Sequence, residues 1–233
     1  MTYCISDIHG CYSEFMALLE KINFSAEDIL YILGDMIDRG PDSIKCLQHV
    51  MNAPNMHMIM GNHEQMMIDA LDNLDELDYA ENWFYNGGDK VFAEFMAVGE
   101  DNQDAIIKHI VDLPYLREVK IGEQNYVLVH AGIDVSAVGS GSEISTAKVL
   151  PNQHIDDLLW IREKFYRKKA LPRSITIFGH TATRSIQRGN GSKIWRDKRF
   201  GDKIGIDGGC VYGGNLLALR LDDMEEFAIK KRG

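Results

Sequence analysis

Polar residues follow five short apolar segments of this chain, and a glycine stands beside them each time. The apolar segments, each predicted to be a buried strand, span residues 2–6, 29–33, 56–60, 126–129 and 174–178. They are followed, in order, by Asp7-Ile8-His9-Gly10, Gly34-Asp35-Met36-Ile37-Asp38-Arg39-Gly40, Gly61-Asn62-His63-Glu64, His130-Ala131-Gly132 and Gly179-His180-Thr181. In open α/β sheets, ligands bind beyond the carboxyl ends of the strands. The pattern therefore predicts that five strands deliver Asp, His or Asn to one edge.

Hydrophobic periodicity between these strands predicts the fold class. Apolar residues at helical spacing follow each of the first three strands, and this β-α-β-α-β-α order calls for a largely parallel sheet. Pro41 is expected in the first turn of the second helix. A period of two over residues 116–121 and 126–129 predicts an antiparallel hairpin, and residues 134–153 are expected to form a loop.

The C-terminal part of the chain returns to strands. The strands expected there span residues 203–206, 215–221 and 225–230. Strands at both ends with helices between them predict an α/β fold of two stacked sheets, with helices outside. A length of 233 residues is compatible with one domain over residues 1–233.

Composition excludes several classes of protein. Lys and Arg number 25 against 35 Asp and Glu, and a net charge of −10 argues against binding to a nucleic-acid backbone. No apolar run approaches the ~18 residues of a membrane span, and the N-terminus lacks the basic start of a secretory signal. The four cysteines show no Cys-x-x-Cys spacing, so free, buried thiols are expected. We therefore expect a monomeric cytoplasmic protein.

The residue types at the strand ends indicate metal chemistry. Imidazole together with carboxylate selects Mn, Fe, Zn or similar ions over Ca. Two such ions about 3.5–4 Å apart need one ligand that bridges them. The series of motifs therefore predicts a centre of two divalent metal ions.

The same series resembles the phosphoprotein phosphatase family of metallophosphoesterases. Within that family it is most similar to the bacterial and bacteriophage-lambda type of serine/threonine protein phosphatase. The resemblance covers residues 4 to about 217, with residues 134–155 poorly matched. It implies an α/β metallophosphoesterase-like two-sheet β-sandwich flanked by helices, in four layers α/β/β/α.

The resemblance also implies a role for each matching residue. The implied metal ligands are Asp7, His9, Asp35, Asn62, His130 and His180, with Asp35 bridging two ions, Mn²⁺ first and Fe, Zn or Ni as alternatives. Arg39 and Arg162 would bind the substrate phosphate. A metal-bridging hydroxide would attack phosphorus in line, with His63 as general acid. Asp38 would orient His63 and raise its pKa.

The motifs leave two other functions open. A symmetrical bis(5'-nucleosyl)-tetraphosphatase uses the same metal motifs on a phosphoanhydride, whose leaving group needs a general acid less. The pair of Asp38 and His63 therefore favours a phosphorylated protein or a small phosphoester as substrate. A catalytically dead phosphopeptide-binding module is the other alternative, but such a protein should have lost a ligand, and all six are present.

Overall fold

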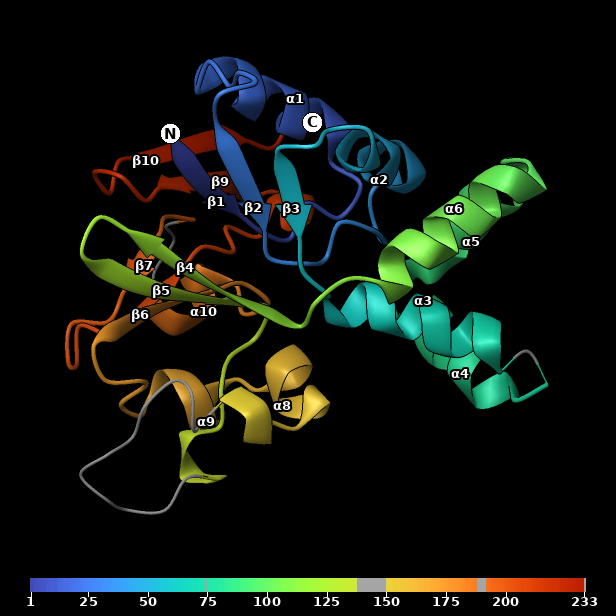
Figure 1. Cartoon of the computed structure of the whole chain (residues 1–233). Coiled ribbons are helices and arrows are strands. Elements are labelled where there is room, and N and C mark those ends of the chain that lie inside the picture. The colour runs from blue at the N-terminus through green and yellow to red at the C-terminus, as the bar shows by residue number, and fades with distance from the viewer. Residues whose placement is uncertain (74, 138–149, 188–191, 233) are drawn as a thin grey trace.

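Two five-stranded sheets face each other in the structure, a computed structural model that describes residues 1–73, 75–137, 150–187 and 192–232 (Figure 1). The first sheet has the order β10-β9-β1-β2-β3 and the second the order β4-β5-β6-β8-β7. The strands of the first are β1 (Thr2–Ile5), β2 (Ile29–Ile32), β3 (Met56–Met58), β9 (Asn215–Arg220) and β10 (Glu226–Lys230). Those of the second are β4 (Leu116–Ile121), β5 (Gln124–Val129), β6 (Ser174–Phe178), β7 (Trp195–Arg196) and β8 (Lys203–Gly205).

Parallel strands lie side by side in both sheets, so their carboxyl ends are aligned. In the first sheet Ile5 pairs with Ile32, and Ile32 pairs with Met58. Helices α1 (Tyr12–Lys21) and α2 (Ser43–Met51) make the two crossovers. In the second sheet β5, β6 and β8 are parallel. The antiparallel strands β9, β10, β4 and β7 complete two mixed sheets, so the expectation of a largely parallel sheet holds only for the central strands.

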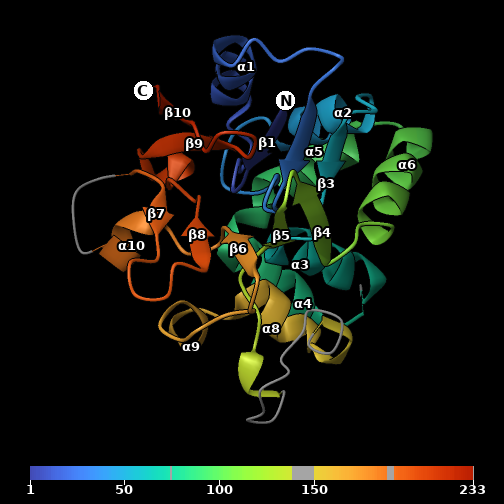
Figure 2. The ribbon, with the colours of Figure 1, turned by 60° about the vertical axis from the view of Figure 1, so that its left-hand side comes forward.

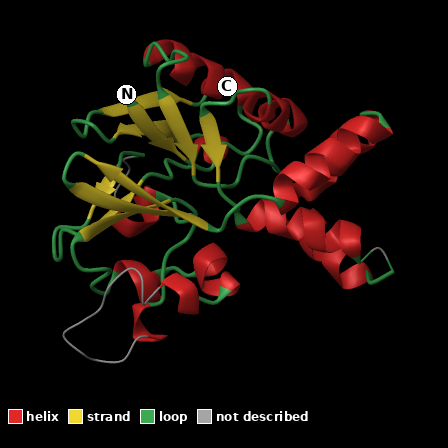
Figure 3. Ribbon diagram, viewed as in Figure 1, coloured by secondary structure: helices red, strands yellow, loops and turns green. Residues whose placement is uncertain are grey.

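Alternation along the strands separates the apolar core into layers. In β1, Tyr3 and Ile5 pack against α1 and α2, whereas Cys4 faces the second sheet. In β5, Tyr126 and Leu128 belong to the cluster between the sheets, and the intervening valines pack toward α8 (Ile155–Trp160) and α9 (Glu163–Tyr166). The predicted four-layer α/β/β/α sandwich is confirmed (Figure 3).

A helical arm projects from the carboxyl end of β3 (Figure 1). It consists of α3 (Asn62–Asp72), α4 (Leu77–Trp83), α5 (Asp89–Ala97) and α6 (Glu100–Val111), with one π-helical turn at Phe84–Gly88. The turn follows from glycine, because Gly87 has a φ of 100°. This break falls at Asn86-Gly87-Gly88 of the sequence.

Some expected boundaries are wrong. Helix α2 begins at Ser43 with Asp42 as its N-cap, so Pro41 precedes the helix instead of starting it. The expected loop at 134–153 contains short 3₁₀ turns at Val135–Ala137 and Leu150–Asn152, and residues 138–149 lie outside the described residues. All four cysteines are free and buried, as expected. Within the described ranges, no helix has the length and apolar character needed to span a membrane.

Candidate active site

The loops that follow β1 and β2 are joined by backbone hydrogen bonds. The amides of Asp7, His9 and Gly10 donate to the carbonyls of Gly34, Asp35 and Met36, at 3.2, 2.9 and 2.8 Å. Gly61 packs directly against the loop after β2, since a Cβ on Gly61 would lie only 2.3 Å from the Asp35 nitrogen. The small residues of the motifs thus let three strand ends approach one another.

Left-handed backbone is concentrated at this edge of the sheets. Among the described residues, nine other than glycine have a positive φ. Six of them are predicted site residues, namely Asp7, His9, Asp35, Asp38, Arg39 and His180. Such conformations are strained for L-residues and cluster at functional sites, where the surrounding structure imposes them.

The carboxylate of Glu64 holds the loop after β2. Its Oε2 accepts hydrogen bonds from the amides of Asp35 and Gly61 at 2.9 and 3.1 Å. Its Oε1 accepts from Met36 and Ile37 at 2.8 and 3.3 Å. Glu64 is fully buried, and burial raises its pKa to about 7. The sequence contained this residue within its third motif but did not predict its role.

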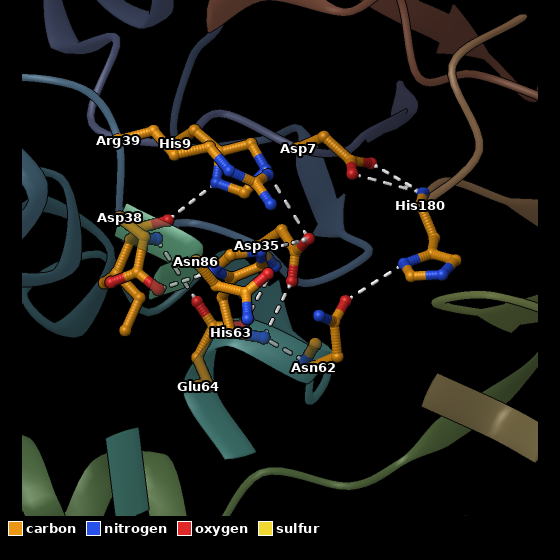
Figure 4. Close-up of polar contacts among 12 residues, drawn as sticks. Asp7, His9, Asp35, Asp38, Arg39, Asn62, His63, Glu64, Asn86 and His180 are labelled. Carbon is orange, nitrogen blue, oxygen red and sulfur yellow. Dashed lines mark hydrogen bonds and ion pairs between the residues drawn. The ribbon is translucent and has the colours of Figure 1, made fainter. Parts of the chain in front are cut away.

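Asp35 lies between two groups of imidazoles. His9 and His63 form one group with it, and His130 and His180 form the other, each within 4.8 Å. Its Oδ2 is 3.5 Å from His9 Nε2, and its Oδ1 is 3.4 Å from His130 Nε2. Asp35 thus occupies the position that the sequence analysis gave to a bridging ligand (Figure 4).

The proton positions of two histidines show that this cluster suits a cation. Nδ1 of His9 lies 2.7 Å from the Ile37 carbonyl, and Nδ1 of His130 lies 2.7 Å from the Leu33 carbonyl. A carbonyl only accepts, so each Nδ1 carries the proton and each Nε2 presents a lone pair. Nε2 of His130 then faces Asn62 Oδ1 at 2.9 Å with no proton between them. Converging lone pairs of this kind fit a metal ion, and backbone carbonyls fix the ligand tautomers.

The remaining predicted ligands, Asp7, Asn62 and His180, line a cavity that Asp35 also lines. The side chains of Asn62 and His180 face each other. Asn62 Oδ1 is 3.0 Å from His180 Nδ1. The Asp7 carboxylate accepts a hydrogen bond from the His180 backbone amide at 3.0 Å (Figure 4). Asp7 lines the cavity but belongs to neither group around Asp35. Burial and the nearby Asp35 charge raise the pKa of Asp7 to about 6.

His63 and Asp38 are in direct contact, as the sequence analysis expected. Nδ1 of His63 binds Asp38 Oδ2, and the indole nitrogen of Trp83 donates to both oxygens of Asp38 at 3.0 and 3.1 Å. The contact orients His63 so that its Nε2 lies 3.9 Å from Asp35 Oδ2, within the cavity. Trp83 is therefore a further positioning residue, which the motifs alone did not reveal.

The expected rise in the pKa of His63 is wrong for this structure. Burial lowers the pKa of His63 well below its usual range, and the charges of His9 and Arg39 lower it further. Burial also raises the pKa of Asp38 to about 8. Desolvation disfavours both charged forms, so it outweighs the attraction between the two groups.

Both predicted phosphate-binding arginines line the cavity. Arg39 contacts His9 Nε2 at 2.6 Å and lies over the Tyr212 ring at 5.4 Å. Arg162 donates to the His180 carbonyl and to the Thr181 hydroxyl at 3.1 and 3.2 Å. It is the N-cap of α9 and not part of a helical face. The cavity has a volume of about 270 Å³.

The structure adds Asp207 to the predicted residues. This aspartate follows β8, is 6% exposed and lines the cavity. Its carboxylate accepts a hydrogen bond from Gly209 at 2.7 Å, and burial raises its pKa well above the usual value. The sequence contained a signal for Asp207, since Asp207-Gly208-Gly209 repeats the pattern of a polar residue and a glycine after a strand.

This fold and this cluster of imidazoles and carboxylates define a phosphoesterase of the calcineurin-like type. A family model described as calcineurin-like phosphoesterase matches residues 2–214, and the chain belongs to that family. It is therefore a hydrolase of phosphoester bonds, from a family that uses divalent metal ions. The resemblance drawn from the motifs is confirmed at this level.

Particular relatives fall into two groups. Serine/threonine-protein phosphatase 1 of Salmonella typhimurium is 31% identical over 222 residues, which cover 94% of this chain and 91% of that protein. The symmetrical bis(5'-nucleosyl)-tetraphosphatase of Aggregatibacter actinomycetemcomitans is 34% identical over 154 residues, which cover 65% of this chain and 50% of that protein. A crystal structure of a candidate diadenosine tetraphosphatase, 20% identical, has a TM-score of 0.68 and covers 99% of this chain and 93% of that one. That likeness confirms the fold.

Proposed function

We propose that this chain is a metal-dependent serine/threonine protein phosphatase. The observation that carries the proposal is the position of Asp35 between His9 on one side and His130 and His180 on the other, with the pair of His63 and Asp38 beside it. A carboxylate shared by two ions and a separate acid are what the hydrolysis of a phosphomonoester needs. The nearly full-length match to serine/threonine-protein phosphatase 1 supports this substrate class.

The proposed division of the ligands follows the family resemblance, and the grouping of His9, His130 and His180 around Asp35 supports it. Asp7 and His9 would hold one ion, and Asp35 would bridge it to a second. Asn62, His130 and His180 would hold the second ion. Mn²⁺ is the proposed metal, because imidazole, carboxylate and amide oxygen together suit it.

The chain's own residues would bind the phosphate and supply a proton. The guanidinium groups of Arg39 and Arg162 would hold the non-bridging phosphate oxygens. Asp38, whose pKa is raised to about 8, would donate a hydrogen bond to Nδ1 of His63, so that Nε2 would carry a proton and point into the cavity. As the Nε2 proton passes to the leaving oxygen, the Asp38 proton would pass to Nδ1. Divalent ions held at the site would polarise the phosphate and lower the pKa of a water, so that hydroxide is available as the nucleophile at neutral pH.

Phosphate release after exchange of the metal tests the proposal. Protein stripped of metal should be inactive and should recover activity on phosphoserine and phosphothreonine peptides when Mn²⁺ is added. Diadenosine tetraphosphate is assayed in parallel. Peptide turnover that requires His63 supports a protein phosphatase. A preference for the dinucleotide with little dependence on His63 would instead identify a nucleotide hydrolase.

The nucleotide hydrolase remains the second candidate for a structural reason. Two exposed rings, Trp160 and Tyr212, line the cavity, and such rings can stack on a base. The match to symmetrical tetraphosphatases covers a smaller part of the chain and ends within it. The side-by-side assay separates the two functions.

A further inference from the structure

A third arginine lines the cavity, and its side chain has no protein partner in the described part of the chain. Arg184 belongs to α10 (Thr183–Gln187), beside β7 and β8 (Figure 2). Arg39 and Arg162 both contact other residues of the site. For Arg184, the structure contains no hydrogen bond or ion pair with any residue in the ranges that it describes. Its charge is therefore available to a ligand.

The backbone around Arg184 is fixed to the wall of the cavity. The amide of Thr183, a fully buried residue, donates to the Asp207 carbonyl at 2.9 Å. The guanidinium carbon of Arg184 lies 4.0 Å from the point that a Cβ on Gly209 would occupy. This is an ordinary van der Waals distance, and the φ of +65° at Gly209 is the backbone conformation that favours glycine there. Arg184 thus packs on the loop that carries Asp207.

Among the described residues, no carboxylate of the cavity forms an ion pair with Arg184. Asp7, Asp35 and Asp207 line it, and all three are more than nine-tenths buried. Asp7 and Asp207 accept hydrogen bonds from backbone amides, and Asp35 accepts one from the His63 amide. A guanidinium binds carboxylate and phosphate through the same fork of donors. An anion that enters with the substrate would therefore meet Arg184.

We propose that Arg184 is a specificity-determining residue that binds a second anionic group of the substrate, beyond the phosphate that reacts. The inference rests on the proposed phosphatase function and names the substrates that this site prefers. The second group is a phosphate or a carboxylate. An acidic phosphopeptide supplies the carboxylate, and a dinucleoside polyphosphate supplies the phosphate.

Four substrates and three variants test the role of Arg184. The substrates are p-nitrophenyl phosphate, a phosphoserine peptide flanked by Asp with its Ala-flanked partner, and diadenosine tetraphosphate. Arg184→Ala should lower kcat/KM about ten-fold for the substrates with a second anion, the size expected for one charged hydrogen-bonding group. It should leave p-nitrophenyl phosphate and the Ala-flanked peptide nearly unchanged, and Arg184→Lys should retain part of the preference. Lys120→Ala removes one positive charge from an exposed site on β4 and should change nothing.

The pattern across substrates decides the outcome. If kcat/KM of Arg184→Ala falls only for the Asp-flanked peptide, or only for the dinucleotide, the result supports the subsite and shows whether it binds a carboxylate or a phosphate. An equal loss on p-nitrophenyl phosphate, or no loss on any substrate, overturns it. If the wild type hydrolyses none of them, the proposed function has failed. Calorimetric binding of the same peptide pair, with a phosphonate in place of the phosphate, then decides the role of Arg184 independently of turnover.

Discussion

Individual residues of the site have a strained backbone conformation, and hydrogen bonds hold that conformation in place. Each left-handed residue costs on the order of 1–3 kcal/mol. Asp35 has a φ of 53°, and its amide is held by the buried carboxylate of Glu64. Because the same carboxylate accepts three further amides, Glu64 is the main internal support of this loop.

Glu64→Gln should therefore weaken both the fold and the metal site. A glutamine keeps the shape, but its NH₂ group would face amide donors that need an acceptor. We expect the free energy of unfolding to fall by about 1–3 kcal/mol. Affinity for Mn²⁺ should fall about 10–100-fold, as for other groups that orient metal ligands. Urea unfolding and metal titration measure the two effects.

Glu94→Gln is the matched control for this substitution. Glu94 accepts the amides of Ser43 and Ile44 at the start of α2, outside the cavity. This variant should lose stability and keep its metal affinity. If both variants lose affinity equally, Glu64 has no particular role in positioning Asp35.

His63→Asn tests the proposed general acid. Asparagine cannot donate an acidic proton, so kcat should fall by about 10²–10⁴-fold. The metal content, measured on the purified protein, should not change, because His63 is not among the proposed ligands. An unchanged kcat, or protein that no longer holds metal, would refute this role.

The sequence pointed to most of the site residues because their motifs follow a strand and contain a glycine, whereas Arg162 came from the family resemblance alone. Eight of the ten predicted residues line one cavity, and the other two, Asp38 and His130, are fully buried. The roles of Glu64 and Trp83 were not predictable, since both act through hydrogen bonds to residues 27 to 45 positions away. The pKa of His63 also depends on burial, which no motif records.

At the level of elements, the helical arm contacts Asp38, the partner of the proposed acid. Helix α4 ends at Trp83, whose indole nitrogen binds Asp38, and the π-helical turn brings the Gly87 carbonyl to the Arg39 amide at 3.0 Å. The arm therefore contacts both a residue that orients the acid and a residue proposed to bind phosphate.

Gly88→Ala should disturb this contact. A Cβ at Gly88 would lie 2.3–2.5 Å from three atoms of the Trp83 ring, so the ring must move. We expect a loss of stability of about 1–3 kcal/mol, typical of overpacking. Activity should fall as well, because Asp38 loses its indole partner. Gly99→Ala, with no atom within 4 Å, should change stability by less than about 1 kcal/mol.

Unfolding followed by tryptophan fluorescence, together with kcat, measures both variants. If Gly88→Ala matches Gly99→Ala in stability and in kcat, the arm does not position Asp38.

The short elements near the second sheet, β7 and α8 to α10, were not predicted. Each has two to six residues, too few for hydrophobic periodicity to identify.

At the level of the whole molecule, the buried carboxyl groups make stability depend on pH and metal. Burial raises the pKa of Asp35 to about 7, and burial raises the pKa of Asp38 to about 8. In the unfolded chain these groups lose their protons near pH 4. Between about pH 6.5 and 8.5 the folded state therefore binds more protons than the unfolded state, and stability falls as pH rises.

Metal-free protein should lose on the order of 1–3 kcal/mol of stability over this pH range. The buried histidines offset part of this fall near pH 6.5, because in the unfolded chain they bind protons with a pKa of about 6.5 and in the folded state their pKa is lower. Above about pH 7.5 the histidines are neutral in both states, so the carboxyl groups alone set the trend there. Bound Mn²⁺ favours the ionised carboxylates, so the loaded protein should show a smaller decrease. Urea midpoints at pH 6.5 and 8.5, in EDTA and in Mn²⁺, measure this. A metal-free midpoint that stays constant or rises would contradict it.

The sequence by itself determined the order of strands and helices, the two-sheet fold and the residues delivered to one edge. These follow from local periodicity and from the glycines beside each polar residue. Only the tertiary structure decided what surrounds each side chain: the amides gathered by Glu64, the indole on Asp38, the lone pairs facing Asp35 and the free guanidinium of Arg184. Burial, pKa and hydrogen-bond partners arise when distant segments pack together, so they have no counterpart in the spacing of residues along the chain.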